Sequence, residues 1–350
     1  MSLVEKYKVL GPAVGSPLWE AMVFVAAQHA DDDTLTHLSA AVLPQGRYVE
    51  RASGAARAPR GAGARAAVVD PDALVGADVF TRPNGVGYYA RLWGEHSDVM
   101  ALRKAREITA RAFSGAEGSA MFPLLYGAPG CGKTALVEAA FGEDTVTLMG
   151  TGDTETADML GGYVQTPAGG FEWVDGGLVR AVEHGLVYFI DEIGLIDPKV
   201  LSLIYGLMDG RRELVITANP ERGTIVAHPN FYVVAATNPN APGVRLSEAL
   251  LSRFTLQTEL STDWGLARKL GVETTMVTAA QNLAKKQDSG EVTWAPQMRE
   301  LLAYRDISKE FGKTFALANL LAASPELDRP VVQDVLQRAF GNDSIRPARI

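Results

Sequence analysis

The chain has 350 residues, of which 47% are hydrophobic, and its formal net charge at pH 7 is −8. This length suits two or three domains with a sizeable core, and the acidic balance lacks the basic footprint that is typical of nucleic-acid-binding proteins. A single cysteine excludes an intramolecular disulfide framework and suits a reducing cytoplasm, and we expect neither a signal peptide nor a membrane-spanning helix.

The first part of the chain predicts a small extension in front of the main domain. Residues 1–50 contain candidate helices, the second of which Asp33 and Thr34 could cap. Residues 52–67 carry only Ala, Gly, Pro, Ser and Arg, a composition typical of a flexible linker. We therefore divide the chain into four parts: an N-terminal helical region at 1–50, a linker at 51–77, an α/β core at 78–262 and a helical C-terminal domain at 263–350.

The core is predicted to alternate strands and helices. It opens with a turn at Asn84-Gly85 between short aromatic stretches, and an Arg-rich amphipathic helix follows at 97–113. The alternation beyond it predicts a doubly wound parallel sheet with helices on both faces. The candidate strands are 122–126, 145–148, 186–190 and 231–236, and the candidate helices are 133–141, 176–184 and 198–209. From about residue 263 we expect helices only, at 274–286, 296–304, 313–323 and 330–339, with Pro296 and Pro330 in first turns.

Residues 127–134 read Gly-Ala-Pro-Gly-Cys-Gly-Lys-Thr and match the phosphate-loop pattern G-x-x-x-x-G-K-[ST] without mismatch. An apolar strand precedes the string and a helical pattern follows it, which is the context that the motif needs. The glycines let backbone N–H groups face phosphate oxygens, Lys133 would reach the β- and γ-phosphates, and Thr134 would bind Mg²⁺. We therefore expect the following residues to bind ATP: Gly127, Ala128, Pro129, Gly130, Cys131, Gly132, Lys133, Thr134 and Ala135.

Two further strands are predicted to end in polar residues. The apolar stretch 186–190 runs into Asp191-Glu192, where Asp191 can hold Mg²⁺ and Glu192 can orient or deprotonate an attacking water. The stretch 231–236 leads to Asn238, which can hydrogen-bond both phosphate and water. The alternative for Asn238 is a plain turn residue, because Asn-Pro-Asn-Ala-Pro-Gly begins there.

The phosphate loop, the Asp-Glu strand, Asn238, the string Ala-Leu-Leu-Ser-Arg-Phe at 249–254 and the helical tail together resemble the AAA+ ATPases, over about residues 97–340. The resemblance implies a five-stranded parallel sheet, a helical lid and a ring of subunits. Arg253 matches that family's arginine finger, which enters the neighbouring subunit's site; Arg245 could share this role, and a surface salt-bridge arginine is the plainer alternative. Arg299 matches the lid arginine that reaches the γ-phosphate, with a loosened Pro-Gln-Met-Arg spacing, and Arg305 is the fallback.

Two segments are similar to the MoxR, CobS and McrB-type branch of this family. Residues 161–181 look like the hairpin that this branch inserts in its second core helix. Residues 213–227 are expected to form a second β-hairpin with its turn at Asn219–Gly223. We expect Arg222 in that turn to be exposed and to serve the substrate rather than the nucleotide.

The resemblance thus implies Mg²⁺-dependent ATP hydrolysis by a homo-oligomeric ring, with a hexamer as the family's usual form, that remodels a protein target in the cytoplasm. A von Willebrand-type partner is a further implication. The alternative is a McrB-like or helicase-like motor on nucleic acid, which the acidic charge disfavours. A small-molecule P-loop kinase would need neither Asn238 nor Arg253, and a poorly hydrolysing scaffold would not need Glu192. Cys131 is either a thiol with a lowered pKa or simply a permitted loop residue.

Overall fold

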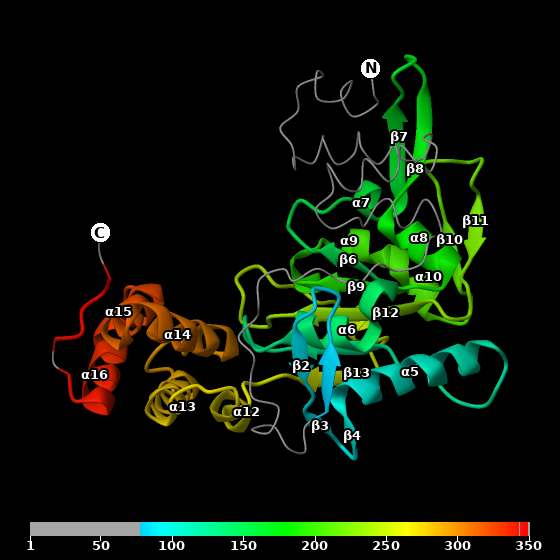
Figure 1. Cartoon of the computed structure of the whole chain (residues 1–350). Coiled ribbons are helices and arrows are strands. Elements are labelled where there is room, and N and C mark those ends of the chain that lie inside the picture. The colour runs from blue at the N-terminus through cyan, green and yellow to red at the C-terminus, as the bar shows by residue number, and fades with distance from the viewer. Residues whose placement is uncertain (1–77, 343, 349–350) are drawn as a thin grey trace, which may run out of the picture. The chain divides into compact units, whose positions relative to one another are not determined.

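The computed structural model describes residues 78–342 and 344–348 (Figure 1). All of them belong to one compact unit that spans Val68–Ile350. The predicted N-terminal helical region at 1–50 and the linker at 51–77 lie outside the described residues. Two separate hydrophobic clusters divide the described part into a sheet-containing core and a C-terminal group of helices.

A five-stranded parallel sheet forms the centre of the core, in the order β13-β5-β12-β9-β6. Its strands are β5 (Pro123–Tyr126), β6 (Thr145–Met149), β9 (Val187–Asp191), β12 (Tyr232–Thr237) and β13 (Leu256–Glu259). Every residue of β9 and β12 is buried, which explains why their sequences are nearly continuous apolar runs. The predicted fold class and four of the strands are thereby confirmed. The edge strand β13 was missed individually because its four residues alternate between half-buried and exposed and form no apolar run.

Three of the core helices were predicted, at 97–113, 133–141 and 176–184, and a short one at 156–160 was not. They are α5 (Asp98–Phe113), α6 (Lys133–Phe141), α7 (Thr156–Leu160) and α8 (Gly177–His184). The single helix expected at 198–209 is instead broken into α9 (Pro198–Leu201), η4 (Ser202–Ile204) and α10 (Tyr205–Met208). Glycine is a poor helix former, so Gly206 weakens this segment as a helix. It also lets the backbone lie close to Glu213 at the start of β10, since a Cβ on Gly206 would lie 2.9 Å from the Glu213 carbonyl oxygen.

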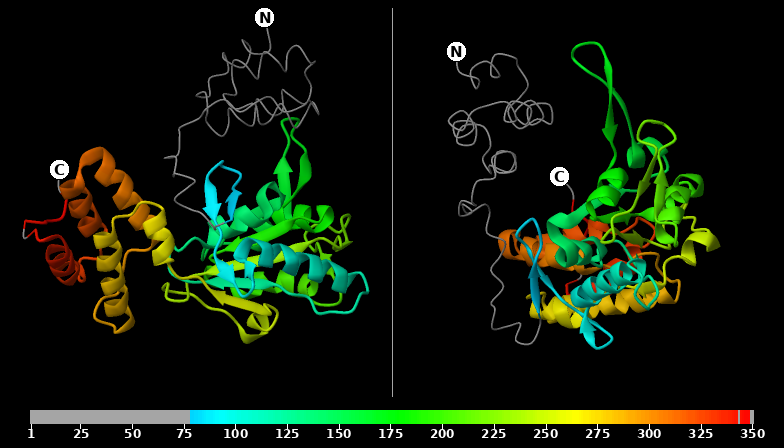
Figure 2. Two further views of the ribbon diagram at one scale, coloured as in Figure 1. Left: turned by 60° about the horizontal axis from the view of Figure 1, so that its bottom comes forward. Right: turned by 90° about the vertical axis from the view of Figure 1, so that its right-hand side faces the viewer.

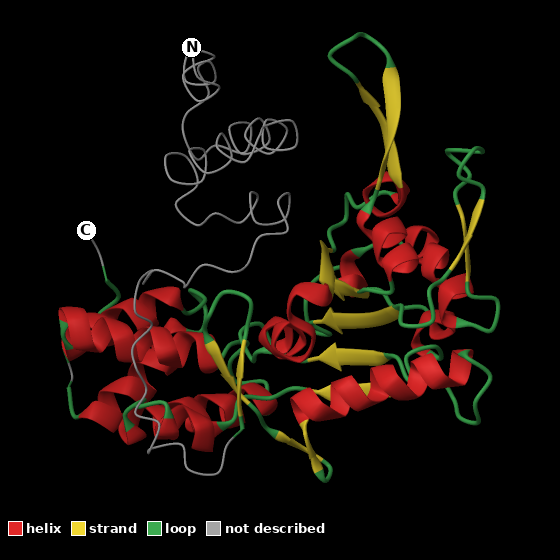
Figure 3. Cartoon of the chain, turned by 45° about the vertical axis from the view of Figure 1, so that its right-hand side comes forward, coloured by secondary structure: helices red, strands yellow, loops and turns green. Residues whose placement is uncertain are grey.

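Two antiparallel hairpins extend from the core (Figures 1 and 3). The first pairs β7 (Gly161–Gln165) with β8 (Phe171–Asp175) between α7 and α8, which confirms the predicted insertion. Glycines stand at its base because a Cβ on Gly161 would lie 2.1 Å from the oxygen of Val174, and one on Gly176 would lie 2.3 Å from that of Met159. The second hairpin pairs β10 (Glu213–Val215) with β11 (Thr224–Val226), as predicted.

Two smaller hairpins precede α5. Strands β1 (Val79–Thr81) and β2 (Gly87–Tyr89) enclose the predicted Asn84-Gly85 turn, in which Gly85 has a φ of 81°. Strands β3 (Leu92–Trp93) and β4 (His96–Ser97) form a second pair. Two residues per strand are too few to give a sequence pattern, so this pair was not predicted.

After β13 the described residues form helices only (Figure 2). They are α12 (Trp264–Lys269), α13 (Thr274–Asp288), α14 (Met298–Phe311), α15 (Lys313–Ala323) and α16 (Arg329–Phe340). Pro330 lies in the first turn of α16, as expected. Pro296 does not lie in a first turn, because Gln297 caps α14 in a reciprocal capping box with Glu300. Within the described part of the chain, no helix is both long and apolar enough to cross a bilayer.

Candidate functional site

The phosphate loop joins β5 to α6 and follows a path that only glycine permits. Gly127, Gly130 and Gly132 have φ angles of 153°, 84° and 102°. A Cβ on Gly127 would lie 2.2 Å from the carbonyl oxygen of Leu260. No side chain caps the N-terminus of α6. The first N–H groups of this helix therefore meet no competing side chain, and they and the helix dipole favour an anion there.

Lys133 is buried at the start of α6, and its ammonium is held inside the loop. Its Nζ donates to the carbonyl oxygens of Gly127 at 2.8 Å and of Ala128 at 3.2 Å. A buried ammonium is stable only where hydrogen bonds compensate for lost hydration. The loop therefore presents a fixed positive charge that matches a phosphate.

Thr134 and Asp191 meet although they come from different motifs. The Thr134 hydroxyl donates to Asp191 Oδ2 at 2.7 Å, and Asp191 Oδ1 accepts from the backbone N–H of Glu192 at 3.1 Å. A hydroxyl and a carboxylate are oxygen ligands of the type that Mg²⁺ prefers. The described residues contain no cluster of three or more His, Cys, Asp or Glu that could hold a metal. This donor set fits Mg²⁺, which is bound by one or two carboxylates together with phosphates and water.

Glu192 and Asn238 lie together at the tips of β9 and β12. Glu192 has a φ of 53°, a left-handed conformation that costs a non-glycine residue about 1–3 kcal/mol and is concentrated at functional sites. Its Oε2 accepts the backbone N–H of Asn238 at 3.2 Å. The Asn238 side chain accepts the N–H of Asn240 at 3.2 Å, so it also forms the turn that the plainer interpretation expected.

The structure places Arg253 on the ring of Tyr205. Its guanidinium lies 4.4 Å from the ring centroid, and Nη1 donates to the carbonyl oxygen of Ala249 at 2.6 Å. The Tyr205 hydroxyl in turn hydrogen-bonds Ser247 Oγ at 3.1 Å. Within the described part of the chain Arg253 forms no ion pair. The salt-bridge interpretation of this residue therefore finds no support there.

The other candidate arginines differ in their distance from the loop. The backbone N–H of Arg299 donates to the Gly130 carbonyl at 3.3 Å, so the first turn of α14 lies against the phosphate loop. The Arg299 side chain itself is exposed. Arg305 instead pairs with Asp306 at 2.7 Å and donates to Leu270 within the helical part, which makes it a poor substitute for Arg299. Arg245 is exposed, and its backbone N–H binds the Gly194 carbonyl at 2.7 Å.

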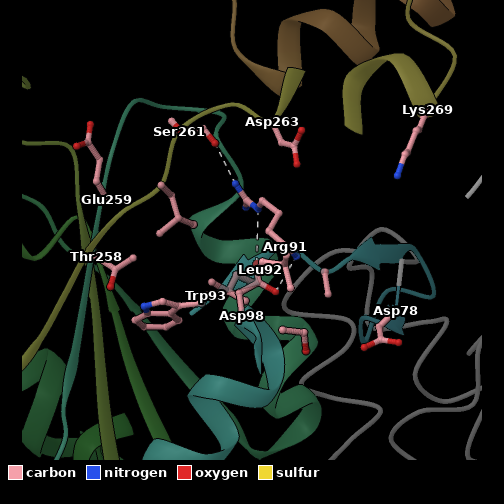
Figure 4. Close-up of a pocket in the computed structure, with 14 residues that line it drawn as sticks. Asp78, Arg91, Leu92, Trp93, Asp98, Thr258, Glu259, Ser261, Asp263 and Lys269 are labelled. Carbon is pink, nitrogen blue, oxygen red and sulfur yellow. Dashed lines mark hydrogen bonds and ion pairs between the residues drawn. The ribbon is translucent and has the colours of Figure 1, made fainter. Parts of the chain in front are cut away.

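Sequence reasoning missed Arg91, which follows the β2 strand. Its Nη2 donates to the Cys131 carbonyl at 3.2 Å and its Nη1 to the Ser261 carbonyl at 3.0 Å. The buried Asp98 lies 3.5 Å from its Nε (Figure 4). Burial opposes the charge, but Tyr88 and Asp98 raise the pKa of Arg91 above its usual value. No motif marks this residue, because the two carbonyl groups that tie it to the phosphate loop and to the segment after β13 lie 40 and 170 positions away in the sequence.

An open cavity of about 650 Å³ adjoins Arg91 (Figure 4). Its wall combines polar and apolar groups, among them Trp93, Asp98, Leu136 and Lys269. It adjoins the phosphate loop through Arg91, which binds Cys131, and through Leu136 of α6.

The Cys131 side chain is buried in the phosphate loop. Burial raises the pKa of its thiol, and the opposing effects of Lys133 and Arg91 do not cancel this rise. A thiol of this kind is protonated at neutral pH and is a poor nucleophile. The plainer interpretation of Cys131, as a permitted loop residue, is therefore favoured.

Known proteins resemble this chain over part of its length. Midasin from Dictyostelium discoideum is 37% identical over 142 residues, which cover 38% of this chain and 2% of midasin. An uncharacterized protein from Staphylococcus epidermidis is 34% identical over 140 residues, which cover 37% of this chain and 52% of that protein. An uncharacterized protein from Staphylococcus aureus (strain USA300) is 34% identical over 170 residues, which cover 44% of this chain and 62% of that protein. The chain thus spans less than two thirds of the length of each of these relatives.

A solved structure from Cytophaga hutchinsonii, provisionally described as an ATPase, covers 69% of this chain and 92% of its own, with 16% identity and a TM-score of 0.36, too low to carry an argument. The family model that matches is the AAA domain of the dynein-related subfamily, over residues 123–254. This range begins at β5 and ends directly after Arg253, so it contains the phosphate loop, both polar strand tips and the inserted hairpin. Residues 123–254 therefore form an AAA domain of the dynein-related subfamily.

Proposed function

We propose that this AAA domain binds ATP and Mg²⁺ and hydrolyses ATP, that it works as a homo-oligomeric ring, and that hydrolysis remodels a protein target. The contact between Thr134 and Asp191 carries the catalytic part of the proposal. It supports a single site in which the phosphate loop, a metal-binding carboxylate and Glu192 act together. A reducing cytoplasm is the compartment that the single cysteine favours.

Each residue of the site has a role that its contacts support. Lys133 supplies a buried positive charge for the β- and γ-phosphates, and Thr134 with Asp191 would hold Mg²⁺. When bound, Mg²⁺ neutralises phosphate charge and so favours attack on the γ-phosphate. Glu192 orients the attacking water and accepts its proton, and the Asn238 N–H that binds its carboxylate fixes its position.

The ring follows from Arg253. A guanidinium stabilises charge that develops during phosphoryl transfer, and this residue has no carboxylate partner in the described part of the chain. We propose that it acts on the ATP of a neighbouring subunit, as its counterpart does in the family, and that the ring is a hexamer. Arg299, whose backbone touches Gly130, would act on its own subunit's nucleotide.

The target is proposed to be a protein because of the β7–β8 hairpin. The side chains of Tyr163, Val164, Phe171 and Val174 are all exposed on it. Residues 161–175 contain Glu172 and Asp175 but neither lysine nor arginine. A surface that follows a nucleic-acid backbone needs positive charge, whereas exposed aromatic and aliphatic side chains suit contact with a polypeptide. A MoxR- or CobS-like role with a von Willebrand-type partner is the form of this proposal that the family resemblance suggests.

The decisive experiment measures phosphate release by the purified full chain. We expect Mg²⁺-dependent release that an unfolded polypeptide stimulates and that single- and double-stranded DNA do not. The isosteric Glu192→Gln variant is the matched control for contaminating ATPases. Equal release by this variant would overturn the catalytic assignment, and stimulation by DNA alone would favour the nucleic-acid motor.

A further inference from the structure

Arg222 lies in the turn between β10 and β11, where the sequence predicts an exposed side chain. The structure shows it bound to the other hairpin instead. Its Nε and Nη2 donate to the two carboxylate oxygens of Asp175, at 3.2 and 2.7 Å, and Nη2 also donates to Glu183 Oε1 at 2.8 Å. Asp175 is the last residue of β8, and Glu183 belongs to α8. One guanidinium therefore joins the tip of the second hairpin to the base of the first.

The contact continues into the aromatic face of the first hairpin. Asp175 Oδ1 also accepts the indole N–H of Trp173 at 2.7 Å. The Trp173 ring packs edge-on against Tyr163, with the centroids 5.3 Å apart. Arg222, Asp175, Trp173 and Tyr163 thus form a continuous chain of contacts across two hairpins that are separate in the sequence.

Loss of Arg222 would leave two carboxylates facing each other without a cation. Asp175 and Glu183 are each about a quarter exposed, at 26% and 29%, so their repulsion is only partly screened by water. The glycines at the base of β7–β8 provide no side-chain contact of their own that could hold the hairpin. A bidentate arginine–carboxylate pair fixes direction as well as distance, which a lysine cannot do.

We propose that Arg222 is a positioning residue that fastens the β10–β11 turn to the base of the β7–β8 hairpin, so that the two hairpins move as one arm. The aromatic face of the first hairpin then takes its orientation from the second. This inference deepens the proposed function, because it assigns a means by which movement of the core reaches the surface proposed to contact the polypeptide. The connection of the two hairpins through Arg222 can be tested without nucleotide or substrate.

The test uses the full chain labelled with 5-fluorotryptophan, observed by ¹⁹F NMR, with Trp173→Phe to assign the Trp173 signal. We expect Arg222→Ala to move this signal toward the position of a solvent-exposed indole. Amide hydrogen exchange in 161–175 should accelerate roughly three- to tenfold, as expected for a partly exposed charge-assisted pair. Arg222→Lys should restore part of the protection, and Arg222→Ala should add nothing in an Asp175→Asn background.

Arg211→Ala is the matched control, because Arg211 belongs to the same region but pairs only with its neighbour Asp209 among the described residues. Exchange of the buried β12 amides reports whether each variant is folded. An unchanged Trp173 signal in folded Arg222→Ala, or an equal effect of Arg211→Ala, would overturn the proposal. Basal phosphate release should be unchanged in Arg222→Ala. If the ATPase assignment is wrong, the wild type itself will release no phosphate, whereas the Trp173 signal and the amide exchange test the contact between the hairpins independently of ATP hydrolysis.

Discussion

The hydroxyl of Thr134 donates to the carboxylate of Asp191 at 2.7 Å, across 57 positions of sequence. Thr134 lies in the first turn of α6, which the phosphate loop joins to β5, and Asp191 is the last residue of β9. Strands β5 and β9 are not adjacent in the sheet, because β12 lies between them. Parallel strands present their carboxyl ends at one edge of the sheet, where open α/β folds bind ligands. The same edge brings Glu192 and Asn238 together, and the following predictions depend on this arrangement.

Lys133 and Glu192 should fail in different ways. Lys133→Ala removes the buried charge that faces phosphate and should abolish nucleotide binding. Glu192→Gln keeps the shape of the side chain but not its basicity, so it should bind nucleotide normally and turn over at least ~10²-fold more slowly. Fluorescent-nucleotide titration and phosphate release separate the two effects. Equal loss of binding in both variants would contradict the role given to Glu192.

Thr134→Ala should raise the Mg²⁺ concentration needed for half-maximal turnover, because it removes one of two oxygen ligands. It also takes one hydrogen bond from the buried Asp191, so the free energy of unfolding without nucleotide should fall by about 1 kcal/mol. A Mg²⁺ titration and urea unfolding measure these quantities. Thr134→Ser keeps the hydroxyl and serves as the control. An unchanged Mg²⁺ dependence in Thr134→Ala would exclude this residue as a ligand.

Arg253 tests the ring. Arg253→Ala should bind ATP with near-normal affinity and hydrolyse it at least ~10³-fold more slowly. Mixing it with Lys133→Ala subunits should restore some activity, because a mixed ring contains interfaces where an intact phosphate loop meets an intact Arg253. If co-assembly is confirmed and the mixture stays inactive, Arg253 acts within its own subunit or is only structural.

Tyr205 should support Arg253 through its ring. Tyr205→Leu removes the aromatic face beneath the guanidinium, a contact worth about 0.5–2 kcal/mol, so turnover should fall roughly two- to thirtyfold at unchanged nucleotide affinity. Tyr205→Phe keeps the ring, loses only the contact with Ser247, and should stay close to the wild type. In the Arg253→Ala background Tyr205→Leu should have no further effect. A further loss of turnover in that background would show that Tyr205 does not act through Arg253.

Cys131 should react slowly with alkylating reagents in the folded protein. Since burial raises the pKa of its thiol, the unfolded chain releases this proton first. The contribution of the protonated thiol to stability is therefore present below the unfolded pKa of about 8.5 and falls as the pH rises above it. At pH 8.5 we expect alkylation by iodoacetamide to be at least about tenfold slower in the native state than in urea. Equal rates would show an accessible thiolate.

The sequence alone determined the parts of the site that are local. The eight residues of the phosphate loop specify their conformation themselves, because their glycines permit angles that other residues avoid. The buried strands β9 and β12 were recognisable because both of their faces are covered, which makes their sequences continuously apolar. The turns at Asn84-Gly85 and Asn219–Gly223 were predicted for the same local reason. The roles of Lys133, Thr134, Asp191, Glu192, Asn238, Arg253 and Arg299 in binding and hydrolysis all remain predictions.

Only the tertiary structure decided which distant side chains meet. The edge strand β13 was missed because it forms no apolar run, and α12 because its six residues give too short a pattern. Packing of Gly206 against Glu213 accompanies the break in an expected helix. Arg222 was predicted to be exposed because its turn is polar, yet it binds Asp175, 47 positions away. Arg91 joins Cys131 and Ser261 across 40 and 170 positions. Such contacts depend on how the elements pack, and an arginine that binds across the fold has the same local sequence character as one that faces water.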